Sequence, residues 1–269
     1  MTGYESDEEL TLSSSTLAAL QEFYAERQSR EEEFSKLQAR VEILHAAGTS
    51  GQKLSMDLFA EDWNESQFWY SEETARLLAT ELLEGVTEDM TVAVVSAPSV
   101  FVAIKNILNE APPEQPRPKL VLLEHDNRFG IFPEFVFYDF AQPLKLPDHL
   151  KGTCDRFIID PPYLSEDCQT KTALTVRWLA RSATTAAAAG GNQPSHPRLI
   201  LCTGERMRTL ALRLYKSFGL RTTDYEPKHA RGLSNEFYSY ANFESKDGAW
   251  GWRQEEEEEQ GKGEGKGQL

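Results

Sequence analysis

The sequence has few cysteines and no long apolar run. Its 269 residues include three cysteines, Cys154, Cys168 and Cys202, an odd number without the spacing of metal ligands. We therefore expect neither a disulfide framework nor a metal site, but reduced and mostly buried thiols in a cytoplasmic protein. No apolar segment approaches the length that crosses a membrane. The first residues are acidic, which predicts no secretory signal.

Positive charge is also scarce, since the formal net charge is −15 at pH 7. Residues 1–60 carry −6, residues 253–269 carry −3, and the central residues 61–252 carry the remaining −6. An enzyme that binds duplex nucleic acid usually presents a net cationic face to the phosphates. The charge therefore favours a basic protein partner over nucleic acid.

Composition divides the chain into three regions. We expect residues 1–60 to contain a disordered start and then a long charged helix, capped by the serines at 13–15 and ending at Gly48. Residues 61–245 form the main domain, in which residues 182–197, rich in Ala, Thr and Gly, are predicted to be a low-complexity insertion. Residues 246–269 are predicted to be an acidic, disordered tail.

Strands and helices are predicted to alternate through the main domain. The expected strands are residues 92–95, 120–123, 135–138, 157–159, 199–202, 221–225 and 237–243, and the expected helices are residues 71–83, 100–109, 171–181 and 205–218. This alternation predicts a doubly wound α/β sheet, closed by an antiparallel pair at one edge.

The most informative stretch is Asp160-Pro161-Pro162-Tyr163, which directly follows the apolar run Phe157-Ile158-Ile159. Loops at the carboxyl ends of parallel strands are where α/β proteins bind ligands. Two successive prolines remove two backbone donors and keep the loop extended. The loop therefore presents a carboxylate, carbonyl oxygens and an aromatic face, which together can hold an amino group. The alternative is a proline-rich turn with a surface Asp.

These four residues match the pattern D/N/S-P-P-Y/F/W of methyltransferases that transfer a methyl group from S-adenosylmethionine to a nitrogen. Other segments occur with them in a characteristic order: Gln67-Phe68-Trp69-Tyr70-Ser71, Ser96-Ala97-Pro98-Ser99, Phe137-Tyr138-Asp139 and Asn235-Glu236-Phe237. Together they resemble, over about residues 60–245, the elongation factor 1-alpha lysine methyltransferases, once described as N6-adenine-specific DNA methyltransferases. The resemblance implies a seven-stranded class I methyltransferase fold, with S-adenosylmethionine as cofactor and elongation factor 1-alpha as protein substrate. The helix predicted within residues 1–60 would be an N-terminal helical extension of this fold.

The turn after the first predicted strand lacks the glycine that most cofactor-binding methyltransferases carry. Its residues are Ser96, Ala97, Pro98 and Ser99. The absence of glycine argues against a dinucleotide site, where the backbone must approach a pyrophosphate. S-adenosylmethionine has no phosphate, and small side chains still permit a close approach, so we predict that the turn binds the cofactor. Ser99 could equally cap the helix that follows.

Acidic residues stand at the ends of three predicted strands. Glu124 is predicted to accept the ribose hydroxyls of the cofactor, with Asp126 as the second candidate. Asp139 is predicted, as the resemblance implies, to accept from the adenine amino group. Asp160 is assigned to both catalysis and cofactor binding.

Aromatic and polar residues outside these strand ends complete the predicted site. Trp69 and Tyr70 are predicted to cover the cofactor, although aromatic pairs are more often part of the core. His229 and Asn235 lie in the loop before the last strand and are predicted to border the substrate.

The predicted catalytic group is Asp160 with Pro161, Pro162 and Tyr163. Asp160 would orient the acceptor nitrogen with help from the Pro161 carbonyl, while Tyr163 would pack on the carbon chain or face the ammonium. An adenine amino group would be held in the same way, so the motif alone does not choose between lysine and adenine. The favoured interpretation is a protein-lysine methyltransferase. An N6-adenine methyltransferase of DNA or RNA is the alternative, followed by a non-catalytic binding subunit, against which the intact Asp160 and Tyr163 argue.

Overall fold

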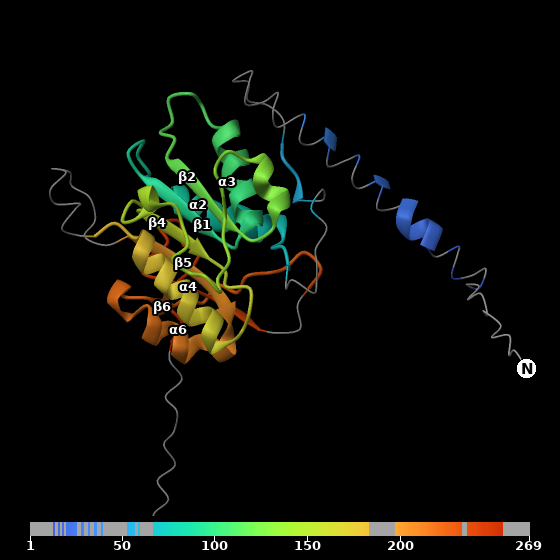
Figure 1. Ribbon diagram of the computed structural model, residues 1–269. Coiled ribbons are helices and arrows are strands. Elements are labelled where there is room, and N and C mark those ends of the chain that lie inside the picture. Colours follow the sequence, from blue (N-terminus) through green and yellow to red (C-terminus); the bar gives the residue numbers. More distant parts are fainter. Residues whose placement is uncertain are drawn as a thin grey trace, which may run out of the picture.

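The computed structural model describes residues 67–182, 197–232 and 236–254, together with short stretches and single positions between residues 13 and 59. Within this part of the chain, seven strands form one sheet in the order β3-β2-β1-β4-β5-β7-β6 (Figure 1). The strands are β1 Thr91–Val95, β2 Lys119–Glu124, β3 Phe135–Phe137, β4 Arg156–Ile159, β5 Arg198–Gly204, β6 Arg221–Thr222 and β7 Phe237–Ala241. The strands β1 to β5 pair in parallel, whereas β7 is antiparallel to β5 and β6. The predicted class I methyltransferase fold is confirmed.

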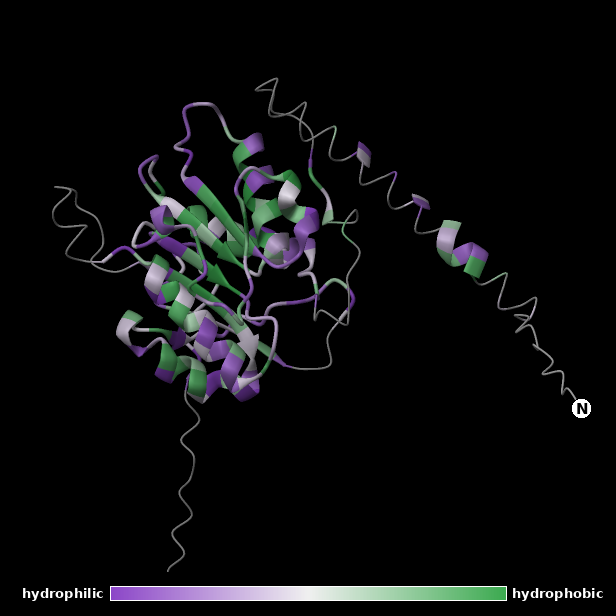
Figure 2. Cartoon of the chain, in the orientation of Figure 1, coloured by the Kyte–Doolittle hydropathy of each residue, from purple (hydrophilic) through white to green (hydrophobic). Residues whose placement is uncertain are grey.

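Helices cover both faces of this sheet. They are α2 Glu72–Leu83, α3 Pro98–Glu110, α4 Glu166–Leu179 and α6 Arg208–Leu214, with 3-10 helices η2 Asn127–Ile131, η3 Asp148–Leu150, η4 Glu205–Met207 and η5 Lys216–Phe218. Successive β1 residues point to opposite faces: Val92 and Val94 join a core with α2 and α3, and Ala93 and Val95 join a core with α4 and α6. Figure 2 accordingly shows the central strands in the green of hydrophobic residues.

Several element boundaries differ from the predicted ones. Helix α4 begins at Glu166, five residues before the predicted start, because the Ser165 hydroxyl accepts from the Cys168 amide at 3.3 Å and caps it. The predicted helix over residues 205–218 is divided into η4, α6 and η5.

The folded domain also extends beyond the predicted boundary at residue 246. Trp250 is buried and packs edge-on against Phe243 at 5.4 Å between ring centroids. Trp252 forms an isolated antiparallel bridge with Thr223. The packing of these two indole rings therefore belongs to the folded domain, although their segment was assigned to the acidic tail that begins at residue 246.

The remaining predicted regions lie mostly outside the described residues. The amide of Thr16 donates to the Ser13 hydroxyl at 3.2 Å, as the predicted helix cap requires, and residues 20–25 are helical. The structure does not describe residues 183–196 of the predicted insertion, residues 255–269 of the predicted tail, or Gly48. No helix in the described part is both long and apolar enough to cross a membrane.

Candidate active site

A cavity of about 790 Å³ lies at the carboxyl ends of the parallel strands. The chain reverses its direction of winding between β1 and β4, which lie side by side in the sheet, and ligands of α/β proteins bind at such switch points. Most of the predicted site residues line the cavity: Trp69, Ser96, Ala97, Pro98, Ser99, Glu124, Asp139, Asp160, Pro161, Pro162, Tyr163 and His229. Tyr70 does not line it, and Asn235 lies outside the described residues.

Asp160 and the three residues after it form a loop that the protein holds in place. The Asp160 amide donates to the Val95 carbonyl at 3.0 Å, which extends the pairing of β4 with β1 by one residue. Gln169 of α4 donates to the Tyr163 carbonyl at 3.2 Å and to the Thr203 hydroxyl of β5 at 3.0 Å. The loop is therefore tied to a neighbouring strand and to the helix that follows it.

The electrostatic environment of Asp160 favours its neutral form. Burial raises the pKa of this carboxyl to about 7, and the negative charge of Glu124 acts in the same direction, while the Tyr70 hydroxyl lowers it. A carboxyl that titrates near neutral pH is characteristic of catalytic sites, where the protonation state matters to the reaction.

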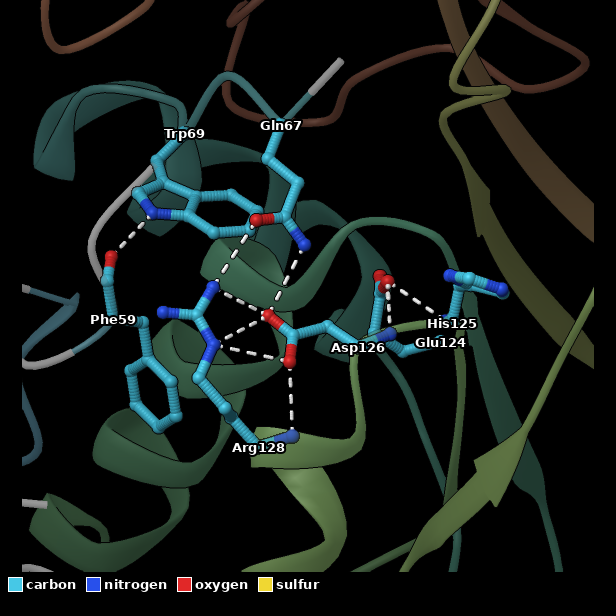
Figure 3. Close-up of polar contacts among 7 residues, drawn as sticks. All are labelled: Phe59, Gln67, Trp69, Glu124, His125, Asp126 and Arg128. Atoms are coloured by element: carbon cyan, nitrogen blue, oxygen red, sulfur yellow. Dashed lines mark hydrogen bonds and ion pairs between the residues drawn. The ribbon is translucent and has the colours of Figure 1, made fainter. Parts of the chain in front are cut away.

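Glu124 ends β2 and is 6% exposed. One carboxylate oxygen, Oε1, accepts from the amides of His125 at 2.8 Å and Asp126 at 3.1 Å (Figure 3). Burial nevertheless raises the pKa of Glu124 to about 7, against these two hydrogen bonds. Among the described residues Oε2 accepts no hydrogen bond, which suits a carboxylate that must receive hydroxyl donors from a ligand.

Asp126, the second candidate for the ribose, is already engaged by protein groups. Its carboxylate accepts from Arg128 Nε at 2.8 and 3.0 Å and from Gln67 Nε2 at 3.1 Å, while Arg128 Nη2 donates to Gln67 Oε1 at 3.1 Å (Figure 3). This cluster holds Gln67, a cavity residue, against the loop after β2. The geometry favours Glu124 over Asp126 as the hydroxyl acceptor.

Asp139 follows β3 and lines the same cavity. Its carboxylate accepts from the Ala141 amide at 2.8 Å and from Gln142 Nε2 at 3.1 Å, and these donors lower its pKa. The side chain is thereby fixed and ionised at the edge of the cavity. Its contact with an adenine amino group stays a prediction.

Ser99 does not cap the helix after β1, so that interpretation is wrong. The N-cap of α3 is Ala97, and Pro98 occupies the first helical turn, where its missing amide hydrogen costs nothing. Ser99 is instead buried, and its hydroxyl accepts from the Tyr70 amide at 3.4 Å.

His229 and Trp69 line the cavity from two segments that pair with each other. The Ala230 amide donates to the Trp69 carbonyl, and the Ser71 amide to the Lys228 carbonyl, both at 2.8 Å. Burial lowers the pKa of His229 to about 4, so its imidazole is neutral at physiological pH. His229 and Trp69 therefore form an uncharged part of the cavity wall.

Comparisons with known proteins agree with this geometry. Residues 61–245 match the protein family described as "Probable N6-adenine methyltransferase". The protein-lysine N-methyltransferase EFM5 of Saccharomyces cerevisiae is 44% identical over 238 residues, which cover 87% of this chain and 92% of the yeast protein. EEF1A lysine methyltransferase 1 is 36% identical in Homo sapiens, covering 91% of this chain and 97% of the human protein, and 38% identical in Gallus gallus, covering 87% and 94%.

The chain belongs to the EEF1A lysine methyltransferase family. The resemblance noted in the sequence is thus confirmed.

Arg206 and Phe140 are among the cavity residues that were not singled out in the sequence. Arg206, in η4, lines the cavity and donates to the Leu164 carbonyl at 3.3 Å. Phe140 lines it as well and packs against Tyr163, with 5.5 Å between the ring centroids. Arg206 follows the end of β5, so the rule that selected Glu124 and Asp160 could have found it.

Among the described residues no group of three or more His, Cys, Asp or Glu could hold a metal ion.

The turn without glycine has a backbone that glycine normally adopts. Ser96 has a φ of +54°, a left-handed conformation that costs about 1–2 kcal/mol for a residue with a Cβ atom. We expect Ser96→Gly to raise the free energy of unfolding by up to about 1 kcal/mol, because the relieved strain exceeds the added freedom of glycine in the unfolded chain. Ser96→Val should lower it by about 2 kcal/mol, since β-branched side chains fit this conformation worst. Urea unfolding measures both changes. If both variants lost the same free energy of unfolding, the left-handed backbone of residue 96 would not be the cause.

Proposed function

We propose that this chain is an S-adenosylmethionine-dependent protein-lysine N-methyltransferase that acts on translation elongation factor 1-alpha. The observation that carries the proposal is the fixed Asp160-Pro161-Pro162-Tyr163 loop, which lines the strand-end cavity together with the buried carboxylate of Glu124. The relatives from yeast, human and chicken, named for lysine methylation and 36–44% identical over most of the chain, support the same activity.

The residues around the cavity fit S-adenosylmethionine. The volume of the cavity, about 790 Å³, lies within the range of about 300–1,000 Å³ typical of small-molecule sites. Glu124 would hold the ribose hydroxyls through Oε2, and Asp139 would accept from the adenine amino group. The turn from Ser96 to Ser99 would let the backbone approach the ligand, and Trp69 would cover it. When bound, S-adenosylmethionine supplies a methyl group activated by its sulfonium charge.

In this proposal Asp160 orients the acceptor nitrogen. A lysine amine has a pKa near 10.4, so its neutral form at pH 7.4 costs about 4 kcal/mol. The Asp160 carboxylate and the Pro161 carbonyl can each accept one N–H, which leaves the nitrogen lone pair directed at the methyl carbon. Asp160 and the Pro161 carbonyl would hold the amine after its ammonium has given up a proton to water, so that the neutral nitrogen faces the methyl group that the cofactor would supply. Tyr163 and Phe140 form the aromatic wall along the lysine chain.

Asp160 is better suited to this task than an ordinary Asp. Its pKa of about 7 is closer to that of an ammonium, so a hydrogen bond between the two is stronger and the proton moves more easily. The pKa of Asp160 still lies below the lysine value of about 10.4, so Asp160 is primarily an orienting group rather than the final proton acceptor.

An N6-adenine methyltransferase is the second candidate, because the matched family carries that description. The charges around the cavity argue against it. Three carboxylates line the cavity, those of Glu124, Asp139 and Asp160, and Arg206 is the one lysine or arginine among its described lining residues. A phosphate backbone would gain little there.

The proposal places the reaction in the cytoplasm and assigns no metal, membrane or nucleic acid to it. Cys154, Cys168 and Cys202 are free and buried, as in proteins of reducing compartments. The proposed substrate is a component of the translation machinery, which the enzyme would meet there.

The test uses elongation factor 1-alpha purified from cells that lack this enzyme. Incubation with methyl-labelled S-adenosylmethionine should place the label on a lysine of that protein, as located by mass spectrometry. Adenine-containing DNA and RNA should receive none, and Asp160→Asn serves as the inactive control. Added salt should slow turnover, because complementary charge speeds the encounter of an acidic enzyme with a basic partner. Labelled N6-methyladenine without labelled protein would overturn the proposal in favour of the second candidate.

A further inference from the structure

Tyr70 follows Trp69 in the chain but, unlike Trp69, does not line the cavity. It is 3% exposed, and its amide donates to the Ser99 hydroxyl at 3.4 Å. Residues on both sides of it pair with the segment around His229, and the two rings are 5.0 Å apart. The first turn of α3 and the His229 segment therefore fix the direction of the Tyr70 side chain.

The Tyr70 hydroxyl is a buried polar group in need of a partner. Among the described residues it makes no hydrogen bond, and the side chains that act on it are the Asp160 carboxylate and the Cys202 thiol. Burial, and then the charge of Asp160, raise the pKa of Cys202, so the thiol stays neutral and is a weak acceptor. The carboxylate is the stronger acceptor, because its charge reinforces the bond.

We propose that Tyr70 is a positioning residue whose hydroxyl donates a hydrogen bond to the Asp160 carboxylate, the group that orients the acceptor nitrogen. The orientation of the acceptor rests on the proposed function, whereas the contact between the two side chains does not.

The groups that face Asp160 give the sign of the effect. They are Tyr70, Glu124, Cys202 and Cys168. Glu124 raises the Asp160 pKa, both thiols have raised pKa values because they are buried, and Tyr70 lowers the Asp160 pKa. Burial raises the pKa of Tyr70 well above its usual value, so the hydroxyl remains a donor throughout the pH range of the protein. Without it, the Asp160 pKa moves further up and less carboxylate is ionised at neutral pH.

The test is Tyr70→Phe, which removes only the hydroxyl. Carbon-13 NMR of the free protein, with aspartate carboxyls labelled and Asp160→Asn to assign the signal, measures the Asp160 pKa without cofactor or substrate. We expect it to be higher in Tyr70→Phe than in the wild type. The matched control is Tyr215→Phe, because Tyr215 is also fully buried with an unpaired hydroxyl among the described residues, but Tyr138, Arg177 and Cys168 surround it rather than Asp160. This control should leave the Asp160 pKa unchanged.

Activity then reports the consequence for the reaction. With saturating cofactor, Tyr70→Phe should shift the acid limb of the pH–rate profile to higher pH, with a rate about tenfold lower at pH 6 and convergence with the wild type above pH 9. An Asp160 pKa that is the same in both proteins would overturn the inference. A raised pKa in a protein that methylates no substrate would support the contact and refute the proposed function, so the two failures are distinct.

Discussion

Replacing Asp160 by asparagine is expected to lower the rate of methyl transfer by at least about a hundredfold while the protein remains folded. The change removes the charge that holds the acceptor amine but keeps the volume and the backbone bond to Val95. Positioned acid–base and orienting groups contribute about 10²–10⁴-fold to rate, so we expect a loss in that range. Single-turnover transfer of labelled methyl measures it, with calorimetry of S-adenosylmethionine binding as the control for an intact cavity. Wild-type turnover of the variant would refute the assignment of this loop as the active site.

The same variant should be more stable than the wild type at alkaline pH. The Asp160 pKa is raised by burial to about 7 in the folded protein, above the value of about 3.9 in an unfolded chain. Unfolding therefore releases protons between these pH values, and the wild type loses stability as pH rises through this window. Asparagine does not titrate, so its melting temperature should exceed that of the wild type at pH 8. The difference should vanish near pH 4, and a constant difference would contradict a perturbed Asp160.

Much of the fold could be predicted from the sequence because burial leaves a strong pattern in parallel strands. Val92–Val95 and Phe157–Ile159 are apolar at every position, as a strand covered on both faces requires. The start of α4 was missed because its first turn is polar, and only the position of Ser165 relative to the helix identifies it as the cap. The ordered segment with Trp250 and Trp252 was assigned to the tail because of the acidic run that follows it, and because the pairing of Trp252 with Thr223 joins segments that are distant in sequence.

The candidate site was predictable where it follows strand ends, and not where it depends on tertiary contacts. Glu124, Asp139 and Asp160 line one cavity because the carboxyl ends of neighbouring parallel strands meet at one edge. The sequence could not show that Asp126 is held by Gln67, or that Asp160 acts on Tyr70, because these relations depend on how segments far apart in the chain come together. Nor could it show the left-handed backbone of Ser96, where a glycine would have been the usual signal.

Replacing Glu124 by glutamine is expected to weaken S-adenosylmethionine binding by roughly 2–3 kcal/mol, or about 30–150-fold, if the carboxylate holds ribose hydroxyls through charge-assisted bonds. The amide keeps one acceptor oxygen and the size of the side chain, so the loss reports the charge. A matched control is Glu134→Gln, because Glu134 is a half-buried carboxylate paired with Lys105 at 2.6 Å and does not line the cavity. Calorimetry should show an unchanged affinity in that variant.

The pH dependence of binding adds a second test of Glu124. Burial raises its pKa to about 7 in the ligand-free protein, and a positively charged cofactor favours the ionised form. Cofactor affinity of the wild type should therefore fall as pH decreases below 7, because binding then requires a proton to be released. In Glu124→Gln this dependence should become weaker, and the part that remains belongs to Asp160, which titrates in the same range. Equal affinity and an equal pH slope in the variant and the wild type would show that another group holds the ribose.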